Sequence, residues 1–449
     1  MFTRRNLIAG STALLGACAA PRVIAPNSGG SPRPDFVRRE GAGFRLDGRP
    51  YRFAGTNMWY AAFLGADAPI GDRTRLSREF DRLVALGIDN VRIAGSAELS
   101  PLKNSVTPGF RDKSSTYNET LLRGLDHALA EMGSRNMKAV IYLTNFWEWS
   151  GGMATYNYWT NGGHFINMND PAHPWPEFAD FSSQFYQNAP AVAMYHDYVR
   201  AVVTRRNTVT GKLYADDPAI MAWQLSNEPR PGGSDAAIKR QLPAYLAWIA
   251  GTARLIKSLD PNHLVSTGSE GPQSCNGDMD CVVQAHSSPD VDYVTSHIWP
   301  QNWSWADPKD LSGTFPTVER NTRDYIAKSV DIAQRAGKPL VIEEFGFPRE
   351  GGSFDPAVPT TNKDRFYKLI YSAVEDSIRT GGIIQGSNFW GWGGEGRAQH
   401  TSDYHFVRGD TSYLADPPHE PQGWYSVLDG DATTQALIKA HAATVKAAA

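Results

Sequence analysis

The stretch PAIMAWQLSNEP, residues 218–229, decides which fold the chain adopts. Its apolar part, as far as Leu225, predicts a buried strand, and the residues that follow end this strand because Pro229 cannot continue a sheet. Glu228 therefore lies just beyond the carboxyl end of a strand, where α/β barrels hold their reactive side chains. For this short motif alone, a helix-capping Asn227 followed by a surface glutamate explains the pattern equally well.

A second apolar run ends in the same way. The stretch PLVIEEFG, residues 339–346, leads a predicted strand into Glu343 and Glu344 and then into a glycine. The chain between the two places is long enough for about three strand–helix repeats, so both carboxyl groups are expected at one rim of a barrel. Hydrolysis of a glycosidic bond requires such a pair, because one carboxyl group protonates the leaving oxygen while the other attacks or activates water.

Size and composition agree with a single large enzyme domain. The chain has 449 residues, of which 41% are hydrophobic and 20% are charged, and (β/α)₈ barrels with insertions reach this length. The net charge is −3 and no basic block is present, so we expect no nucleic-acid partner. Tryptophan, tyrosine and phenylalanine number 13, 18 and 19, and many of them fall between the predicted strands, which suits a sugar-binding cleft.

The N-terminal region is predicted to be an export signal. A twin arginine at residues 4–5 precedes an apolar stretch, 7–17, that is too short to span a bilayer. The sequence LGAC then resembles a bacterial lipoprotein cleavage site, so we predict a signal peptide at 1–18, a lipid on Cys18 and attachment to a membrane in the periplasm or at the cell surface. An ordinary signal peptide with an incidental cysteine is the alternative. A Pro-, Ser- and Gly-rich tether is predicted at 19–40.

The two other cysteines, Cys275 and Cys281, are separated by five residues. Export to an oxidising space makes a disulfide between them the natural interpretation. Two cysteines alone are poor evidence for a metal site, so we predict neither a metal nor a cofactor.

The rest of the chain, residues 41–449, predicts one (β/α)₈ barrel of the α/β class. A D-G turn within 44–53 indicates a β-hairpin that covers the bottom of the barrel. Eight strand patterns follow, at 55–60, 89–93, 138–144, 218–225, 263–267, 291–297, 339–344 and 383–390. Helical patterns alternate with them and include 121–133, 182–206, 242–259, 318–336, 364–379 and 432–446.

Two connections are longer than a barrel needs. Residues 145–181 follow the third strand and are rich in aromatic side chains, and residues 391–431 follow the eighth. Long loops in compact domains are usually functional, although a loop held only by its own aromatic packing is the alternative. Within the strands, Arg92 is costly to bury unless it faces a carboxylate. His297 ends the sixth strand, on the same rim as the two glutamates.

Several motifs in one order resemble glycoside hydrolase family 5: Asn227-Glu228-Pro229, the GKP…EFG run at 337–346, Arg92, His297 and Trp390. More narrowly, WSGGM at 149–153, HIWPQNW at 297–303 and DPPHEPQG at 416–423 look like the β-mannanase subfamily. The resemblance covers roughly residues 44–445.

This resemblance implies a retaining mechanism with Glu228 as acid/base and Glu344 as nucleophile, about 5–5.5 Å apart. Strand alternation is expected to send Glu343 the other way. The resemblance also implies that Asn227 binds the sugar 2-hydroxyl, that His297 lies beside the acid/base, and that Trp390 floors the subsite where the bond breaks. We assign further substrate contacts to three tryptophans and one arginine: Trp59, Trp149, Trp299 and Arg92.

One residue departs from the family pattern. Many relatives have a tyrosine where this chain has Trp299, and an indole can only donate through its ring N–H. Other bacterial members look similar at this position, so the expected activity stands and only the role of this side chain is left open.

The resemblance implies an endo-acting enzyme that cleaves β-1,4-mannosidic bonds in mannan, glucomannan or galactomannan. We expect the protein to be a monomer. The closest alternative is an endo-β-1,4-glucanase on the same barrel. A second alternative is an exo-acting enzyme that trims manno-oligosaccharides, since the two enlarged loops can close one end of the cleft. A non-catalytic carbohydrate-binding protein is the remote one, because such proteins usually lose a catalytic carboxylate.

Overall fold

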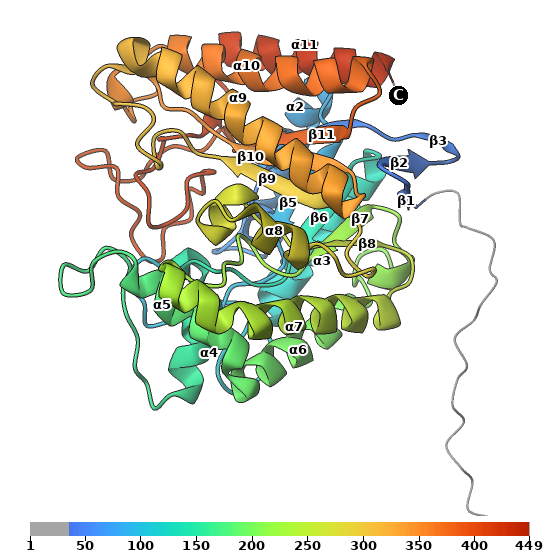
Figure 1. Ribbon diagram of the computed structural model, residues 1–449, viewed down its shortest axis with the longest axis vertical. Helices are drawn as coiled ribbons and strands as arrows, with labels where there is room; N and C mark the ends of the chain where they lie inside the picture. The colour runs from blue at the N-terminus through green and yellow to red at the C-terminus, as the bar shows by residue number, and fades with distance from the viewer. Residues whose placement is uncertain (1–35, 449) are drawn as a thin grey trace, which may run out of the picture. The chain divides into compact units, whose positions relative to one another are not determined.

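The computed structural model describes residues 36–448, which form a barrel of parallel strands surrounded by helices (Figure 1). Eight strands pair in the order β8-β7-β6-β5-β4-β11-β10-β9, and a parallel bridge between Ser266 and Tyr293 joins the two ends of this order. The predicted (β/α)₈ barrel is therefore confirmed. The strands are β4 (Phe53–Asn57), β5 (Asn90–Ala94), β6 (Lys138–Tyr142), β7 (Ile220–Gln224), β8 (Leu264–Ser266), β9 (Val294–Ile298), β10 (Leu340–Phe345) and β11 (Ile384–Phe389).

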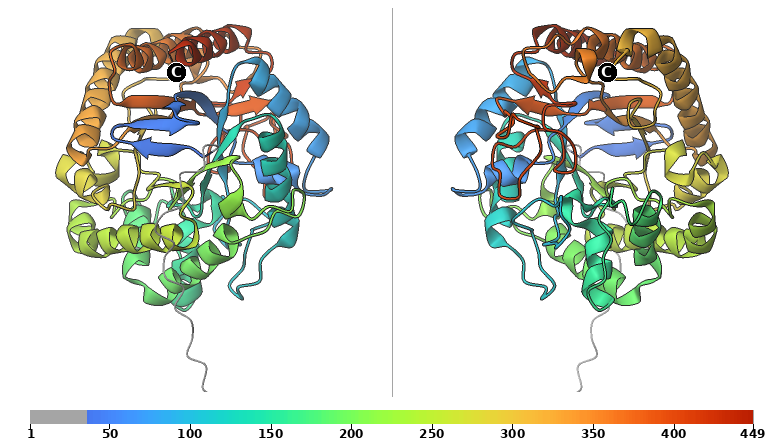
Figure 2. Two further views of the ribbon diagram at one scale, coloured as in Figure 1. Left: turned by 90° about the vertical axis from the view of Figure 1, so that its right-hand side faces the viewer. Right: turned by 90° about the vertical axis from the view of Figure 1, so that its left-hand side faces the viewer.

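Helices surround the barrel on all sides (Figure 2). They begin and end where local capping predicts: the Asn118 side chain accepts from backbone N–H groups in the first turn of α3, and α9 is capped by Gly337, which has φ +65°. The helices are α1 (Ala61–Gly65), α2 (Arg73–Ala85), α3 (Glu119–Ser134), α6 (Ala189–Val203), α7 (Asp235–Leu259), α8 (Met279–Ala285), α9 (Leu311–Ala336), α10 (Thr361–Arg379) and α11 (Ala432–Ala447). None of the helices in the described part of the chain is both long and apolar enough to cross a bilayer.

The N-terminal hairpin is present, and it has a third strand that the sequence did not predict. Strands β1 (Arg38–Glu40), β2 (Gly43–Leu46) and β3 (Arg49–Pro50) form an antiparallel sheet, with the turn at 47–48 in positive φ. The predicted tether, 19–40, extends too far, because residues 36–40 belong to the folded domain.

This extension has a simple cause. Phe36 and Val37 form an apolar pair within an otherwise polar stretch, and both are buried. Val37 packs with Phe44 of the hairpin and with barrel residues that include Tyr293, so this segment covers the bottom of the barrel. The rest of the tether and the signal peptide, with Cys18, lie outside the described residues.

The enlarged connections lie at the opposite end of the barrel from the hairpin (Figure 1). The one after β6 is not irregular as expected, since it contains α4 (Gly152–Thr160) and α5 (Glu177–Ser183). The one after β11 contains the short pair β12 (Trp392–Gly394) and β13 (Val427–Leu428). Single turns of 3₁₀ helix complete the chain, at Glu148–Ser150, Gln184–Gln187, Tyr214–Asp216, Pro272–Cys275 and Glu350–Gly352.

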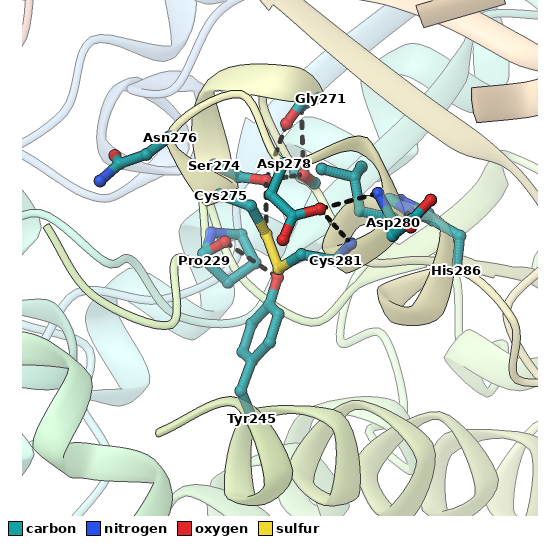
Figure 3. The surroundings of a disulfide bond; sticks show 12 residues. Pro229, Tyr245, Gly271, Ser274, Cys275, Asn276, Asp278, Asp280, Cys281 and His286 are labelled. Atoms are coloured by element: carbon teal, nitrogen blue, oxygen red, sulfur yellow. Dashed lines mark hydrogen bonds between the residues drawn. A yellow bond between two sulfur atoms is a disulfide. The ribbon is translucent and has the colours of Figure 1, made fainter. Parts of the chain in front are cut away.

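Cys275 and Cys281 form a disulfide in the loop after β8 (Figure 3). The loop lies against the segment that follows Glu228, because Asn276 donates to the Gly233 carbonyl at 3.0 Å. From the other side, the Tyr245 hydroxyl of α7 donates to the Pro229 carbonyl at 3.1 Å (Figure 3). The disulfide therefore braces the rim of the barrel next to Glu228.

Candidate active site

Glu228 and Glu344 meet at the carboxyl-terminal rim of the barrel. A carboxylate oxygen of each and a ring nitrogen of His297 all lie within 4.8 Å of one another. Both glutamates line a cavity of about 640 Å³, although each is almost wholly buried. Glu228 follows β7 with φ +49°, a left-handed conformation that is rare for a side chain of this size and often found at functional sites.

Arg92 holds Glu344 from inside the barrel. Its guanidinium Nη1 donates to Glu344 Oε1, Nη2 donates to Asn227 Oδ1 at 2.9 Å, and Nε donates to Gln224 Oε1 at 2.6 Å. Arg92 is fully buried and does not line the cavity. The sequence correctly indicated that it faces a carboxylate, but its contacts are with protein groups beneath the cavity.

Glu343 also faces the barrel interior, so the expectation from strand alternation is wrong. The register between β9 and β10 shifts at this position, which leaves Glu343 as the extra residue of a bulge. Its two oxygens accept from Gln224 Nε2 at 2.7 and 2.8 Å. Because Glu343 is absent from the cavity lining and Glu344 is present, the cavity and not the alternation distinguishes the two glutamates.

Two ring systems contact Glu228. His297 Nδ1 lies 2.7 Å from Glu228 Oε1 and 3.3 Å from Glu344 Oε2. Trp147 donates its indole N–H to Glu228 Oε2 at 2.5 Å. His297 is fully buried and therefore acts on the carboxyl groups, beside Glu228 as the resemblance implied.

Burial and mutual repulsion move the acidities of these groups. Burial raises the pKa of Glu344 to about 8, and repulsion from Glu228 and Glu343 adds to this while His297 and Arg92 oppose it. Burial acts upward on Glu228 too, but the hydrogen bond and charge of His297, with Arg230 and Trp147, lower its pKa below the ordinary value. Burial acts downward on His297, yet the carboxylates, Glu344 first, raise its pKa to about 10.

Taken alone, these directions put the proton of the site on Glu344 and leave Glu228 ionised, whereas the contacts of the two groups indicate the reverse. Two carboxylates this close cannot both stay ionised without a nearby cation or proton. Arg92 carries a permanent charge and bonds Glu344 directly, so we assign the ionised form to Glu344. The proton then belongs to the His297–Glu228 pair, and when Glu228 carries it, the repulsion that raises the pKa of Glu344 disappears.

The other predicted side chains divide into two groups. Asn227, Trp149, Trp299 and Trp390 line the cavity, and the rings of Trp299 and Trp390 meet edge-on at 5.8 Å. Trp59 does not line it: its ring packs against Trp149 at 5.6 Å and its N–H donates to the Ala415 carbonyl. Trp59 thus supports Trp149 from behind.

Several cavity residues were not assigned to the site from the sequence. The aromatic wealth of 145–181 did point to Trp147 and Trp175, which line the cavity. Nothing in the sequence marked the buried pair of Arg230 and Glu270, because its partners lie on different loops. Others that line the cavity are Met168, Asn169, Gln273, Asn302, Trp303, Ser304, Trp305, Pro417, His419, Glu420 and Trp424.

Glu228, His297 and Glu344 are also the one group in the described chain that has donor atoms spaced for a metal ion. However, Arg92 already donates to Glu344 and Trp147 donates to Glu228. Donors that occupy these oxygens favour carboxyl-group chemistry over cation binding.

A (β/α)₈ barrel with two facing carboxyl groups in a tryptophan-lined cavity at its carboxyl-terminal rim defines the class of glycoside hydrolase barrels. The family model described as "GH family 5 beta-mannosidase-like" matches residues 34–449. The chain belongs to this branch of glycoside hydrolase family 5, and it is a glycoside hydrolase.

Its relatives act on mannosides by name. The family 5 mannosidase structure from Rhizomucor miehei is 34% identical, covers 92% of this chain and 98% of its own, and superposes with a TM-score of 0.83. Mannan endo-1,4-beta-mannosidase 7 of Arabidopsis thaliana is 30% identical over 80% of this chain and 78% of its own. An endo-1,4-beta-mannanase structure from R. miehei, at 23% identity and a TM-score of 0.65, shares the fold. The chain therefore belongs among enzymes that cleave β-mannosidic bonds.

Proposed function

We propose that this protein hydrolyses β-1,4-mannosidic bonds with retention of configuration, with Glu228 as acid/base and Glu344 as nucleophile. The separation of the two carboxyl groups carries the proposal. Their nearest oxygens lie within 4.8 Å, which suits the ~5–5.5 Å of retaining enzymes and leaves no room for the water that inverting enzymes hold across ~6.5–9.5 Å.

The contacts of each glutamate support its role. Glu344, bonded to Arg92, attacks the anomeric carbon while Glu228 gives its proton to the leaving oxygen, which yields a glycosyl ester on Glu344. In the second step Glu228 takes a proton from water, and the resulting hydroxide displaces Glu344 from the sugar. The proton taken from water restores Glu228 to its starting form, and His297, 2.7 Å from Glu228, holds its carboxyl group in position. Asn227 is proposed to bind the 2-hydroxyl.

The finer proposal is exo action on manno-oligosaccharides. The two enlarged connections meet beside the cavity, where His419 Nδ1 lies 3.4 Å from the buried Glu148 Oε1. Arg408 adds bonds from the connection after β11 to the carbonyls of Ser100 and Leu102. A cleft bridged in this way admits a chain end more readily than the middle of a polymer. The relatives named endo-mannosidases support endo action, which the sequence resemblance implies.

Two single variants test the mechanism. Glu344→Ala and Glu228→Ala are each expected to lower kcat on an aryl β-mannoside by several orders of magnitude, about 10⁴-fold or more, with the thermal unfolding midpoint nearly unchanged. Azide rescues Glu228→Ala as a β-mannosyl azide and Glu344→Ala as an α-mannosyl azide. NMR identifies the anomer that the wild-type enzyme releases first. Release of the sugar with inverted configuration contradicts the proposal.

Digestion of mannohexaose over time tests the mode of attack. Exo action releases mannose or mannobiose alone at early times, whereas endo action gives a ladder of sizes. Parallel assays on galactomannan and carboxymethylcellulose test the alternatives, because a mannanase degrades the first polymer and a glucanase the second. Binding of a polysaccharide without turnover identifies a non-catalytic protein.

We further propose that the protein is exported as a lipoprotein through Cys18, in the N-terminal segment outside the described residues. Globomycin is expected to block its maturation. A Cys18→Ala protein that still incorporates labelled fatty acid contradicts this proposal.

A further inference from the structure

Trp147 contacts Glu228 from the connection after β6, and the mechanism proposed above gives it no part in either step. Its indole Nε1 lies 2.5 Å from Glu228 Oε2, while His297 approaches the other oxygen. An indole N–H can donate but never accept. The contact therefore stabilises the charged carboxylate relative to the neutral acid.

The position of Trp147 is fixed by an ion pair. The Arg230 guanidinium lies 5.0 Å from the centre of the Trp147 ring, close enough for a cation–π contact. Arg230 in turn makes a forked pair with Glu270, with Nε and Nη2 at 2.5 and 2.7 Å from the two oxygens. Both members of this pair are buried, and Phe178 stacks on the same indole at 6.3 Å.

Glu270 is held by the loop after β8, which the disulfide closes. The Glu270 carbonyl accepts from the Tyr325 hydroxyl at 2.8 Å and from the His297 backbone N–H at 3.0 Å. The disulfide between Cys275 and Cys281 follows a few residues later (Figure 3). Three loops, after β6, β7 and β8, thus meet in one chain of contacts that ends at the Glu228 carboxyl group.

We propose that Trp147 is a positioning residue that orients the Glu228 carboxyl group and favours its charged form, and that the Arg230–Glu270 pair keeps Trp147 in place. The inference rests on the acid/base role proposed for Glu228. In the first step the N–H stabilises the carboxylate that forms as the proton leaves for the glycosidic oxygen. In the second step it keeps Glu228 ionised until the proton of water arrives.

Trp147→Phe tests this directly, because phenylalanine keeps an aromatic ring and removes the N–H. The measurement is the pH dependence of kcat/KM on an aryl β-mannoside, whose alkaline limb reports the acid/base group. Loss of a hydrogen bond to the charged form is expected to raise the pKa of this limb by about 1. The matched control is Trp175→Phe, because Trp175 stacks on Trp147 at 6.3 Å but gives no hydrogen bond to Glu228. This variant is expected to leave the pKa of the alkaline limb unchanged, whatever its effect on KM.

Arg230→Lys tests the second half of the proposal, because it keeps the charge and removes the forked geometry. The variant is expected to raise the pKa of the same alkaline limb. In a Trp147→Phe background it is expected to raise this pKa no further, since the two residues act through one contact. Thermal unfolding of each variant checks that the fold persists. If Trp147→Phe does not fold, the pKa of the alkaline limb in Arg230→Lys decides the inference: a raised pKa supports it and an unchanged pKa overturns it.

The inference is overturned if the pKa of the alkaline limb is unchanged in Trp147→Phe, or if it shifts as far in Trp175→Phe as in Trp147→Phe. Additive shifts from Trp147 and Arg230 overturn the role given to the ion pair. Failure of the proposed function itself is a separate result, because it appears as retained turnover in Glu228→Ala.

Discussion

At the scale of single residues, the two adjacent glutamates of β10 mark the limit of what the sequence predicts. The pattern EEFG indicated a carboxyl group at a strand end, and Glu344 lines the cavity. Strand alternation failed for Glu343, because a bulge turns its side chain inward too. A bulge depends on the neighbouring strand, so the local pattern gave no sign of it.

We expect Glu343→Gln to lower kcat/KM far less than Glu344→Gln. Glu343 accepts hydrogen bonds from Gln224 beneath the cavity. Glu343→Gln therefore removes one charge near Arg92, which is expected to lower kcat/KM roughly tenfold. Loss of the nucleophile is expected to cost about 10⁴-fold or more. Steady-state kinetics of the two variants with azide present measure the difference. Formation of an α-mannosyl azide by a Glu343 variant contradicts the assignment.

At the scale of elements, the sequence predicted all eight barrel strands and the main helices, because each has its own apolar period and capping residues. It could not predict how the connections after β6 and β11 fold, since contacts distant in sequence order them. The connection after β11 is held from α10, where the fully buried Lys363 donates to the Ser426 carbonyl at 3.0 Å and to that of Tyr425 at 3.3 Å.

Lys363 gives this element a dependence on pH. Burial lowers the pKa of Lys363 from 10.5 to about 8. Between these values the folded protein binds fewer protons than the unfolded chain, so this group's contribution to stability rises with pH. Relative to Lys363→Met, the wild-type free energy of unfolding is expected to rise by about 3 kcal/mol from pH 8 to 10.5, as measured by urea denaturation at several pH values.

Lys439→Met, at an exposed position of α11, is the matched control for the loss of one lysine. If the wild type and Lys363→Met change in parallel over this range, Lys363 is not forced towards its neutral form, and the connection after β11 is held in another way.

At the scale of the whole molecule, the two ends of the barrel have different tasks. The carboxyl-terminal rim holds the carboxyl groups and the cavity, whereas the opposite end is closed by β1–β3 over an apolar cluster. The sequence predicted this division through the D-G hairpin and the two strand-end glutamates. It did not predict that residues 36–40 join the closure, because two apolar residues in a polar stretch are too weak a signal.

This division predicts that stability and activity separate. Phe44 is buried under the barrel, with its ring 5.5 Å from that of Tyr293, and Phe44→Ala is expected to cost about 3–5 kcal/mol of unfolding free energy. Because none of the catalytic groups proposed within residues 36–448 lies at this end, kcat/KM at a temperature where the variant remains folded is expected to match the wild type. Val84→Ala, at a position that is 44% exposed on α2, controls for loss of an apolar side chain.

Denaturant unfolding and aryl-mannoside kinetics on the same preparations measure both quantities. Val84→Ala is expected to change the free energy of unfolding by no more than about 0.5 kcal/mol and to leave kcat/KM near the wild-type value. A fall in kcat/KM for folded Phe44→Ala shows that the bottom of the barrel is coupled to the Arg92–Glu344 contact. Such coupling has a physical route, since Arg92 lies inside the barrel on β5 and a shift of that strand moves the guanidinium. Equal kinetics mean that the strands transmit no such shift, and that the rim keeps its geometry while the closure beneath it weakens.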